Sequence, residues 1–280
     1  MTNQNSDSSI PEGQHLFTCG HSFHAWVGEL LSDMARAARI NDHDQVGTSM
    51  IGGSRVIQHW DVPEAQNEAK IALLSGKVDV LTLSCMAGPD EGISKFAKLA
   101  AECNPDGRLT LQELWLPEDR FPFDAANRTR ESVEQFNEST MEDLEKPHEV
   151  YFEVMDKYVS SLNAEIGKQV VFIVPDAQAT LALRERIIAG TAPGLKRQSD
   201  LFTDAWGHPS LPLKLLSGYC HFSVIYRRSP IGLSPPSTLP SDLRLSDALC
   251  LLLQQLAWDA VTQHRLSGLN VNIAKGQVTS

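Results

Sequence analysis

The chain has 280 residues, of which 42% are hydrophobic and 21% are charged, a composition typical of a globular protein with a sizeable core. Asp and Glu outnumber Lys and Arg by 35 to 24, so the formal net charge is −11. An acidic chain has no electrostatic attraction for a nucleic-acid backbone or an anionic membrane surface. We therefore expect neither as a partner and favour a neutral or modest-sized substrate.

The amino-terminal residues 1–13 are polar and rich in Ser and Asn. They lack the basic and then apolar pattern of a signal peptide, so we expect a disordered leader before a single domain over residues 14–280. No run approaches the roughly 18 consecutive apolar residues of a membrane span. The compartment stays open: it is cytoplasmic by default, and periplasmic or secreted if a signal peptide has been removed. The oligomeric state is not predicted.

Up to residue 116, the hydrophobic pattern alternates between strands and helices. Strands are predicted at residues 16–19, 45–51, 78–83 and 109–116, and helices at residues 25–38, 64–75 and 93–103. Alternation of this kind is typical of a parallel sheet with helices on both faces.

Residues 117–148 break this alternation, because they are rich in Asp, Glu, Asn and Arg and contain few large apolar residues. We expect a charged insertion that faces solvent, and a lid or functional loop is the alternative. Beyond it, helices are predicted at residues 150–166, 177–188, 211–226 and 246–264, and a strand at residues 169–174. The pattern predicts one doubly wound α/β domain with a helical carboxyl-terminal segment.

The chain has five cysteines, which are widely spaced and lie in or beside apolar runs: Cys19, Cys85, Cys103, Cys220 and Cys250. Metal sites and disulfide frameworks need spacings that are absent from this set. We predict buried free thiols.

Ser22 lies where the first predicted strand gives way to a helical pattern, within Gly20-His21-Ser22-Phe23-His24. In an open α/β sheet, the active site forms outside the carboxyl ends of the strands. A serine at such a junction can be a nucleophile, or it can cap the helix that follows.

Two later segments supply the other groups that a serine nucleophile needs. The imidazole of His208 can act as the base, and the carboxylate of Asp204 can orient that imidazole. A tetrahedral intermediate needs hydrogen-bond donors, for which the N–H groups of Ser22 and of Gly52 or Gly53 are suitable.

These segments resemble the sequence blocks of the SGNH (GDSL-like) hydrolases. Gly20-His21-Ser22-Phe23 resembles the first block, Gly52-Gly53 the second, and the run from Asp204 to His208 the terminal D-x-x-H block. The resemblance covers roughly residues 16–232 and implies a three-layer α/β/α doubly wound parallel sheet of about five strands. It also implies Ser22 as nucleophile, His208 as base, Asp204 as its carboxylate and Gly53 or Gly52 as oxyanion donor, without a metal or organic cofactor.

The chain departs from the family pattern in two places. Three residues separate Asp204 from His208 where the family has two, so a carbonyl or Asp200 is an alternative support for His208. The family's third block, G-x-N-D, is replaced by Ser-Cys-Met-Ala-Gly-Pro-Asp at residues 84–90. The side-chain amide that the family contributes to the oxyanion site therefore has no obvious source.

Five further residues are candidates for substrate contact. His21 and His24 flank Ser22, and they would bind a metal only with a third ligand, for which the sequence shows no spacing. We expect one of them to line the pocket. Glu113 and Trp115 end a predicted strand at the same edge, and Trp206 precedes His208, with ordinary packing as the alternative for all three.

The combined pattern predicts a serine hydrolase that cleaves a carboxylic ester through an acyl-enzyme intermediate. The expected partner is a small-molecule or carbohydrate ester, and a carbohydrate O-acetyl group as substrate is suggested by the family likeness alone. The alternatives are an acyltransferase, a lyase-like use of the same pocket, and a non-catalytic ligand-binding protein on the same fold.

Overall fold

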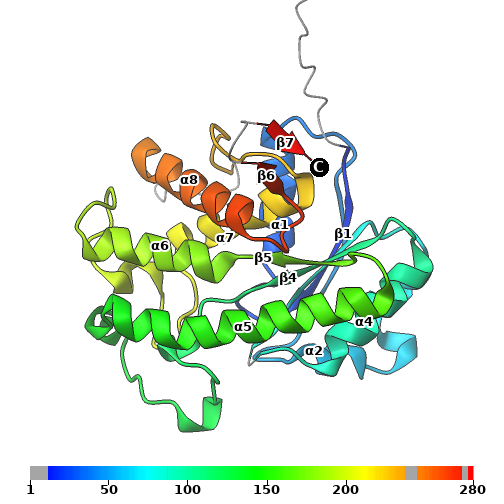
Figure 1. The fold of residues 1–280 in the computed structure, drawn as a ribbon, viewed down its shortest axis with the longest axis horizontal. Helices are drawn as coiled ribbons and strands as arrows, with labels where there is room; N and C mark the ends of the chain where they lie inside the picture. The colour runs from blue at the N-terminus through cyan, green and yellow to red at the C-terminus, as the bar shows by residue number, and fades with distance from the viewer. Residues whose placement is uncertain (1–11, 87, 237–244, 273–276, 280) are drawn as a thin grey trace, which may run out of the picture.

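The computed structural model describes residues 12–86, 88–236, 245–272 and 277–279, so nearly all of the expected leader lies outside the described residues. Five parallel strands form the central sheet in the order β2-β1-β3-β4-β5 (Figure 1). They are β1 (His15–Gly20), β2 (Asp44–Met50), β3 (Val80–Ser84), β4 (Arg108–Gln112) and β5 (Val171–Val174). Near the carboxyl terminus, β6 (Asn270–Asn272) and β7 (Gln277–Thr279) form an antiparallel pair.

Helices cover both faces of the five-stranded sheet (Figure 1). One layer consists of α1 (Val27–Ala37), α6 (Asp176–Ile188), α7 (Leu211–Tyr226) and α8 (Asp247–Gln263). The other consists of α2 (Val56–Trp60), α3 (Glu68–Leu74), α4 (Glu91–Cys103) and α5 (Met141–Ile166). Each layer has its own hydrophobic cluster against the sheet, and neighbouring strand residues such as Leu16 and Phe17 belong to different clusters. The predicted three-layer α/β/α class is confirmed.

The strands differ in burial according to how far helices cover them. All residues of β3 and β5 are buried, because helices cover both of their faces, and such strands read in sequence as continuous apolar runs. Strand β2 lies at an edge and alternates between exposed and partly exposed residues. Because the chain moves from β1 to β2 on one side and then to β3 on the other, the topological switch point lies between β1 and β3.

The strand predicted at residues 109–116 ends earlier, at Gln112. Side chains of α5 bind the backbone that follows: the Leu114 N–H donates to the Tyr151 hydroxyl at 3.1 Å, and the Leu116 N–H donates to His148 Nε2 at 3.5 Å. These contacts replace pairing with a neighbouring strand. The backbone after Gln112 is thereby free to turn toward the carboxyl edge of the sheet.

The predicted insertion at residues 117–148 is only partly a solvent-facing segment. Its last eight residues begin α5, whose cap is Thr140, with the Thr140 side chain accepting the Asp143 N–H. Three short 3₁₀ turns precede it: Pro117–Asp119, Ala125–Asn127 and Val133–Glu138. Asp119 is buried and forms ion pairs with Arg184 and Arg130, so the expectation of solvated charge is wrong at this residue. Two guanidinium groups compensate the cost of burying its carboxylate.

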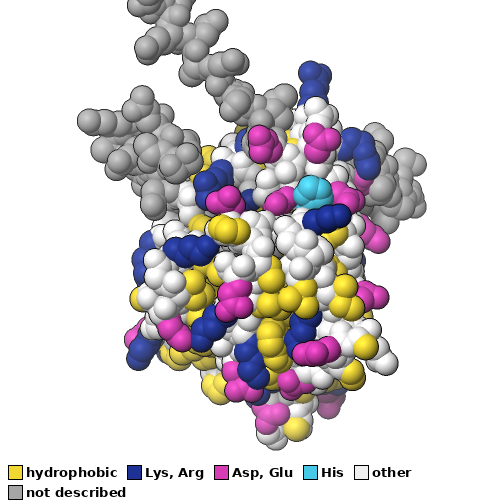
Figure 2. Space-filling view, turned by 90° about the vertical axis from the view of Figure 1, so that its right-hand side faces the viewer, with side chains coloured by type: hydrophobic (Ala, Val, Ile, Leu, Met, Phe, Trp, Pro, Cys, Tyr) yellow, Lys and Arg dark blue, Asp and Glu magenta, His cyan; other side chains and the backbone are white. Residues whose placement is uncertain are grey.

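All five cysteines are free, as predicted, and only Cys103 is partly exposed. Among the described residues, no helix combines the length and apolar character needed to cross a membrane. Figure 2 shows one face of the molecule, on which Lys and Arg are interspersed with Asp and Glu and hydrophobic side chains gather in the lower half.

Candidate active site

Ser22 lies in a turn between β1 and α1. The turn closes where the N–H groups of His24 and Ala25 both donate to the carbonyl of His21, each at 2.9 Å. Helix α1 begins only at Val27, and its N-cap is Trp26. Ser22 is therefore not the cap of this helix, and its partly buried hydroxyl is available to another group.

That group is His208, which lies 186 residues further along the chain. Ser22 Oγ and His208 Nε2 are 2.9 Å apart, and His208 Nδ1 lies 2.7 Å from Asp204 Oδ2. The three side chains form a continuous hydrogen-bonded chain from carboxylate to hydroxyl. The side chains of His208 and Asp204 are 35% and 42% exposed, so the chain of hydrogen bonds reaches the surface.

The loop that carries His208 accommodates three residues between the carboxylate and the imidazole. Gly207 adopts a φ of 86°, which is accessible to glycine at little cost, and its N–H donates to the carbonyl of Asp204 at 3.2 Å. Asp204 Oδ1 accepts the N–H groups of Trp206 and His208 at 2.9 and 3.2 Å, which leaves Oδ2 for the ring. The alternative support, Asp200, instead accepts backbone N–H groups of its own turn.

The environment of Asp204 favours its ionised form. Partial burial pushes the pKa of this carboxyl upward, but hydrogen bonds from the backbone and ring of His208 and from the Trp206 N–H outweigh that effect and hold the pKa below its ordinary value. An ionised Asp204 accepts the Nδ1 proton of His208. Nε2 is then left unprotonated and able to accept the Ser22 proton.

Trp115 and Phe23 pack against the loop and the ring of His208. The Trp115 Nε1–H donates to the carbonyl of Gly207 at 3.0 Å, and its ring stacks on Phe23 with a centroid distance of 5.6 Å. Phe23 in turn meets the His208 ring edge to face at 4.7 Å. Trp115 is buried and does not line the cavity, and its hydrogen bond holds the loop of His208.

The Ser22–His208 pair opens into a cavity of about 320 Å³. The candidates Gly52, Gly53 and Trp206 line it as well. The lining residues that the sequence did not indicate are Phe23, Met86, Pro117, Phe123 and Ala125. Three of these belong to the charged insertion, where no periodic pattern marks them, so the alternative of a functional loop describes that part of the insertion better.

The remaining candidates lie outside the lining of this cavity. His24 is fully buried, with Nδ1 at 2.6 Å from the Gln112 side-chain oxygen, and burial lowers its pKa to about 4. A Cβ on Gly20 would lie 2.8 Å from the His24 ring, so only glycine admits this packing. Burial likewise lowers the pKa of His21 to about 3 and raises that of Glu113 to about 8.

Comparison with known proteins reveals likeness in the fold. The sequence matches no protein-family profile and no curated protein. A DUF4886 family protein from Bacteroides uniformis has a similar structure, with a TM-score of 0.57 and 14% identity, and the alignment covers 90% of this chain and 96% of that one. The chain shares the overall fold of that protein. At this level of identity the likeness shows the fold alone.

Two further solved structures align less closely with this chain. A candidate SGNH hydrolase from Slackia heliotrinireducens gives a TM-score of 0.45 at 14% identity, covering 76% of this chain and 98% of that one. Phospholipase A1 from Streptomyces albidoflavus gives 0.43 at 12% identity, covering 76% and 99%.

The candidate oxyanion groups differ from the SGNH sequence pattern that the chain resembles. The stretch that replaces the third block places Met86 in the cavity lining, and its thioether has no N–H to donate. The lining contains no Asn or Gln side chain in the part of the chain that the structure describes. The N–H groups of Ser22, Gly52 and Gly53 have no hydrogen-bond partner among those residues. Backbone donors are therefore available where a side-chain amide is not.

Proposed function

We propose that the protein is a serine ester hydrolase. The observation that carries the proposal is the hydrogen-bonded chain from Asp204 through His208 to Ser22, which ends at a cavity. The chain supplies a nucleophile, a base and an orienting carboxylate in the geometry that acyl transfer requires. The SGNH-like fold agrees with this assignment, since the nucleophile follows β1 at the switch point.

In the proposed reaction, Ser22 Oγ attacks the ester carbonyl carbon and its proton passes to His208 Nε2. The tetrahedral intermediate collapses, the bond to the alcohol oxygen breaks, and that oxygen takes the proton from Nε2. The acyl group is then bound to Ser22. A water molecule gives its proton to Nε2 as it attacks the acyl carbon, and Nε2 returns this proton to Oγ as the carboxylic acid leaves. Asp204 stays ionised and balances the imidazolium charge.

Backbone N–H groups stabilise the oxyanion in this proposal. Ser22 lies at the point of attack, and Gly52 and Gly53 lie in a tight turn after β2, where Gly53 has a φ of 61°. A Cβ at either glycine would meet nothing within 4 Å, so the turn faces open space and not packed side chains. One missing donor costs on the order of 10²–10³ in rate, so we expect slower turnover than a site with an added side-chain amide.

The cavity favours an ester with an apolar acyl group. Phe23, Met86, Pro117, Phe123 and Ala125 contribute apolar surface, and a volume of about 320 Å³ suits a small to medium group. A sugar ring needs several hydrogen-bond partners, which this lining does not offer. An apolar acyl chain therefore fits better than the carbohydrate O-acetyl group suggested by family likeness.

The experiment that tests the proposal is labelling with a fluorophosphonate, followed by peptide mass mapping. We expect a single adduct on the peptide that contains Ser22, and no adduct in Ser22→Ala. Ser32→Ala is the matched control, because Ser32 lies on α1 with its hydroxyl bonded to the carbonyl of Gly28, and it should label like the wild type. p-Nitrophenyl acetate, butyrate and octanoate report turnover in parallel. Absence of both labelling and turnover in the wild type would contradict the proposal.

A further inference from the structure

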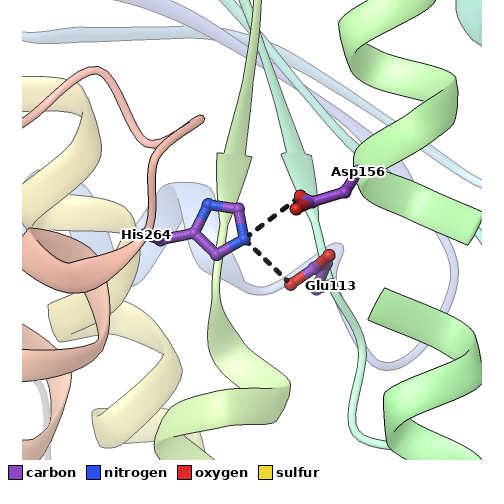
Figure 3. Close-up of side chains that lie close together, drawn as sticks. All are labelled: Glu113, Asp156 and His264. Atoms are coloured by element: carbon purple, nitrogen blue, oxygen red, sulfur yellow. Dashed lines mark ion pairs between the residues drawn. The ribbon is translucent and has the colours of Figure 1, made fainter. Parts of the chain in front are cut away.

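A second group of polar side chains lies apart from the Ser22 cavity. Glu113 follows β4, Asp156 lies on α5, and His264 follows α8, and the three side chains point toward one another (Figure 3). Helices α5 and α8 pack on opposite faces of the sheet. The cluster therefore connects the two helix layers with the carboxyl end of a central strand.

The spacing within the cluster is too wide for hydrogen bonds. His264 Nε2 lies 3.7 Å from Glu113 Oε2 and 3.5 Å from Asp156 Oδ1, and the ligand atoms of all three residues lie within 4.8 Å of one another. Hydrogen bonds between such groups are about 2.7–3.2 Å long. Ligands that each lie about 2.0–2.2 Å from one tetrahedral ion are about 3.3–3.6 Å apart. The two distances from His264 Nε2 are close to those between groups that share an ion.

The surroundings of Glu113 provide an independent argument that a ligand binds at this cluster. Its side chain is fully buried, and its Oε1 has no hydrogen-bond partner among the residues that the structure describes. The other oxygen, Oε2, accepts from the side-chain amide of Gln178, which carries no charge. Asp156 has a cation of its own, because Arg265 lies 3.1 Å from its Oδ2. An ionised Glu113 needs a positive partner in this buried position, and an ion held among the three side chains would supply one.

We propose that Glu113, Asp156 and His264 bind one divalent transition-metal ion, with Zn²⁺ as the best candidate. A set of one imidazole and two carboxylates suits Zn²⁺, whereas Mg²⁺ and Ca²⁺ prefer oxygen ligands alone. The side chains of Asp156 and His264 are 26% and 10% exposed, which gives an ion a way in from solvent. Water would complete the coordination.

Binding has a defined consequence for the chain around His264. The Leu266 N–H donates to His264 Nδ1 at 3.2 Å, an arrangement that places the ring proton on Nε2. An ion at Nε2 moves that proton to Nδ1, and the Leu266 N–H loses this acceptor. The Leu266 carbonyl accepts the N–H of Ile173 on β5 at 2.9 Å. An ion shared by His264 and Glu113 would add a second link between the end of α8 and the sheet.

Zinc titration calorimetry on the full chain, after treatment with EDTA, tests the proposal. We expect one Zn²⁺ per chain, no comparable heat with Mg²⁺, and binding at least about 10-fold weaker in His264→Gln and in Asp156→Asn. His15→Gln is the matched control, because His15 pairs with Asp79 at 2.8 Å in an exposed position away from the cluster. It should bind Zn²⁺ as the wild type does.

Thermal unfolding with and without Zn²⁺ separates a metal site from an ion-pair cluster. For a metal site, Zn²⁺ raises the melting temperature of the wild type and of His15→Gln but not that of His264→Gln. For an ion-pair cluster alone, His264→Gln lowers the melting temperature equally with and without Zn²⁺. That second result, or no Zn²⁺ binding by the wild type, would overturn the proposal. Asp156→Asn changes a partly exposed group, so it keeps the test valid if a variant of buried Glu113 does not fold.

Discussion

Two of the regions in which a histidine lies beside a carboxylate differ in the spacing of these groups. At His208 the ring nitrogen lies 2.7 Å from Asp204, within a hydrogen bond, and the opposite nitrogen meets the Ser22 hydroxyl at 2.9 Å. At His264 the ring nitrogen lies 3.5 and 3.7 Å from two carboxylates, without a hydrogen bond to either. The first arrangement can carry a proton, and the second leaves room for a cation. The same residue types therefore support different chemistry, because distance and burial decide what occupies the space between them.

The sharpest test of this comparison measures both esterase activity and the Zn²⁺-dependent melting temperature on a variant of each site. His208→Ala should lower kcat for p-nitrophenyl butyrate by about 10⁴-fold or more, because the serine loses its base. The same variant should keep its Zn²⁺-dependent rise in melting temperature. His264→Gln should show the reverse, with kcat within about 2-fold of the wild type. Loss of both properties in one variant would mean that the two regions are not independent.

Removal of the Asp204 carboxylate should cause the next largest fall in kcat. Asp204→Asn should reduce kcat by up to about 10⁴-fold, because the amide favours the wrong tautomer of His208. Steady-state kinetics at pH 7 measure the change, and Asp200→Asn serves as the control, since Asp200 accepts backbone N–H groups elsewhere in the loop. An equal loss in the two variants would show that Asp204 does not have this role.

Loss of the hydrogen bond from Trp115 to the His208 loop should reduce activity less, and only through the chemical step. Trp115→Phe keeps a ring against Phe23 but removes the donor to the Gly207 carbonyl, so the loop loses one anchor. We expect kcat to fall about 10-fold with little change in KM. Trp60→Phe, which alters a ring packed against Phe96 in the other helix layer, should change neither parameter. A rise in KM without a fall in kcat would instead indicate a direct contact with substrate.

A third histidine, His24, shows how burial lowers the pKa of an imidazole that has no carboxylate beside it. His24 has its pKa lowered to about 4 by burial, so between pH 6.5 and 4 the unfolded chain binds a proton that the folded chain does not. Its contribution to the free energy of unfolding is therefore present at neutral pH and is lost as the pH falls through that range. The free energy of unfolding, measured with urea, should fall between pH 7 and pH 5. We expect this fall to be about 1–2 kcal/mol smaller in His24→Gln than in the wild type. An unchanged difference would show that His24 does not contribute to acid sensitivity.

Substitution of the glycines that follow β2 should have the smallest effect, and that effect is on stability. Gly53→Ala places a side chain at a φ of 61° and should lower the free energy of unfolding by about 1 kcal/mol. Gly52→Ala is the matched control, because Gly52 has no positive φ and equal free space around it. Urea unfolding of both variants measures the difference, and equal stability would show that the turn relaxes without cost.

Most of the architecture could be predicted from the sequence, because hydrophobic periodicity reports burial directly. Continuous apolar runs marked the buried strands β3 and β5, and 3.6-residue spacing marked the helices that cover them. The boundaries were less certain. Leu114, Trp115 and Leu116 are apolar like the residues of the strand, but contacts from α5 to the Leu114 and Leu116 N–H groups take the place of strand pairing there.

The sequence by itself determined the alternation of strands and helices and the positions of Ser22, Asp204 and His208 as candidates, because local pattern and motif spacing carry that information. Only the tertiary structure decided which side chains meet. It brought Ser22 to His208, and it moved Glu113 from a predicted substrate contact to a buried cluster with Asp156 and His264. Contacts between segments far apart in the chain depend on how the helix layers pack on the sheet, and no short stretch of sequence records that packing.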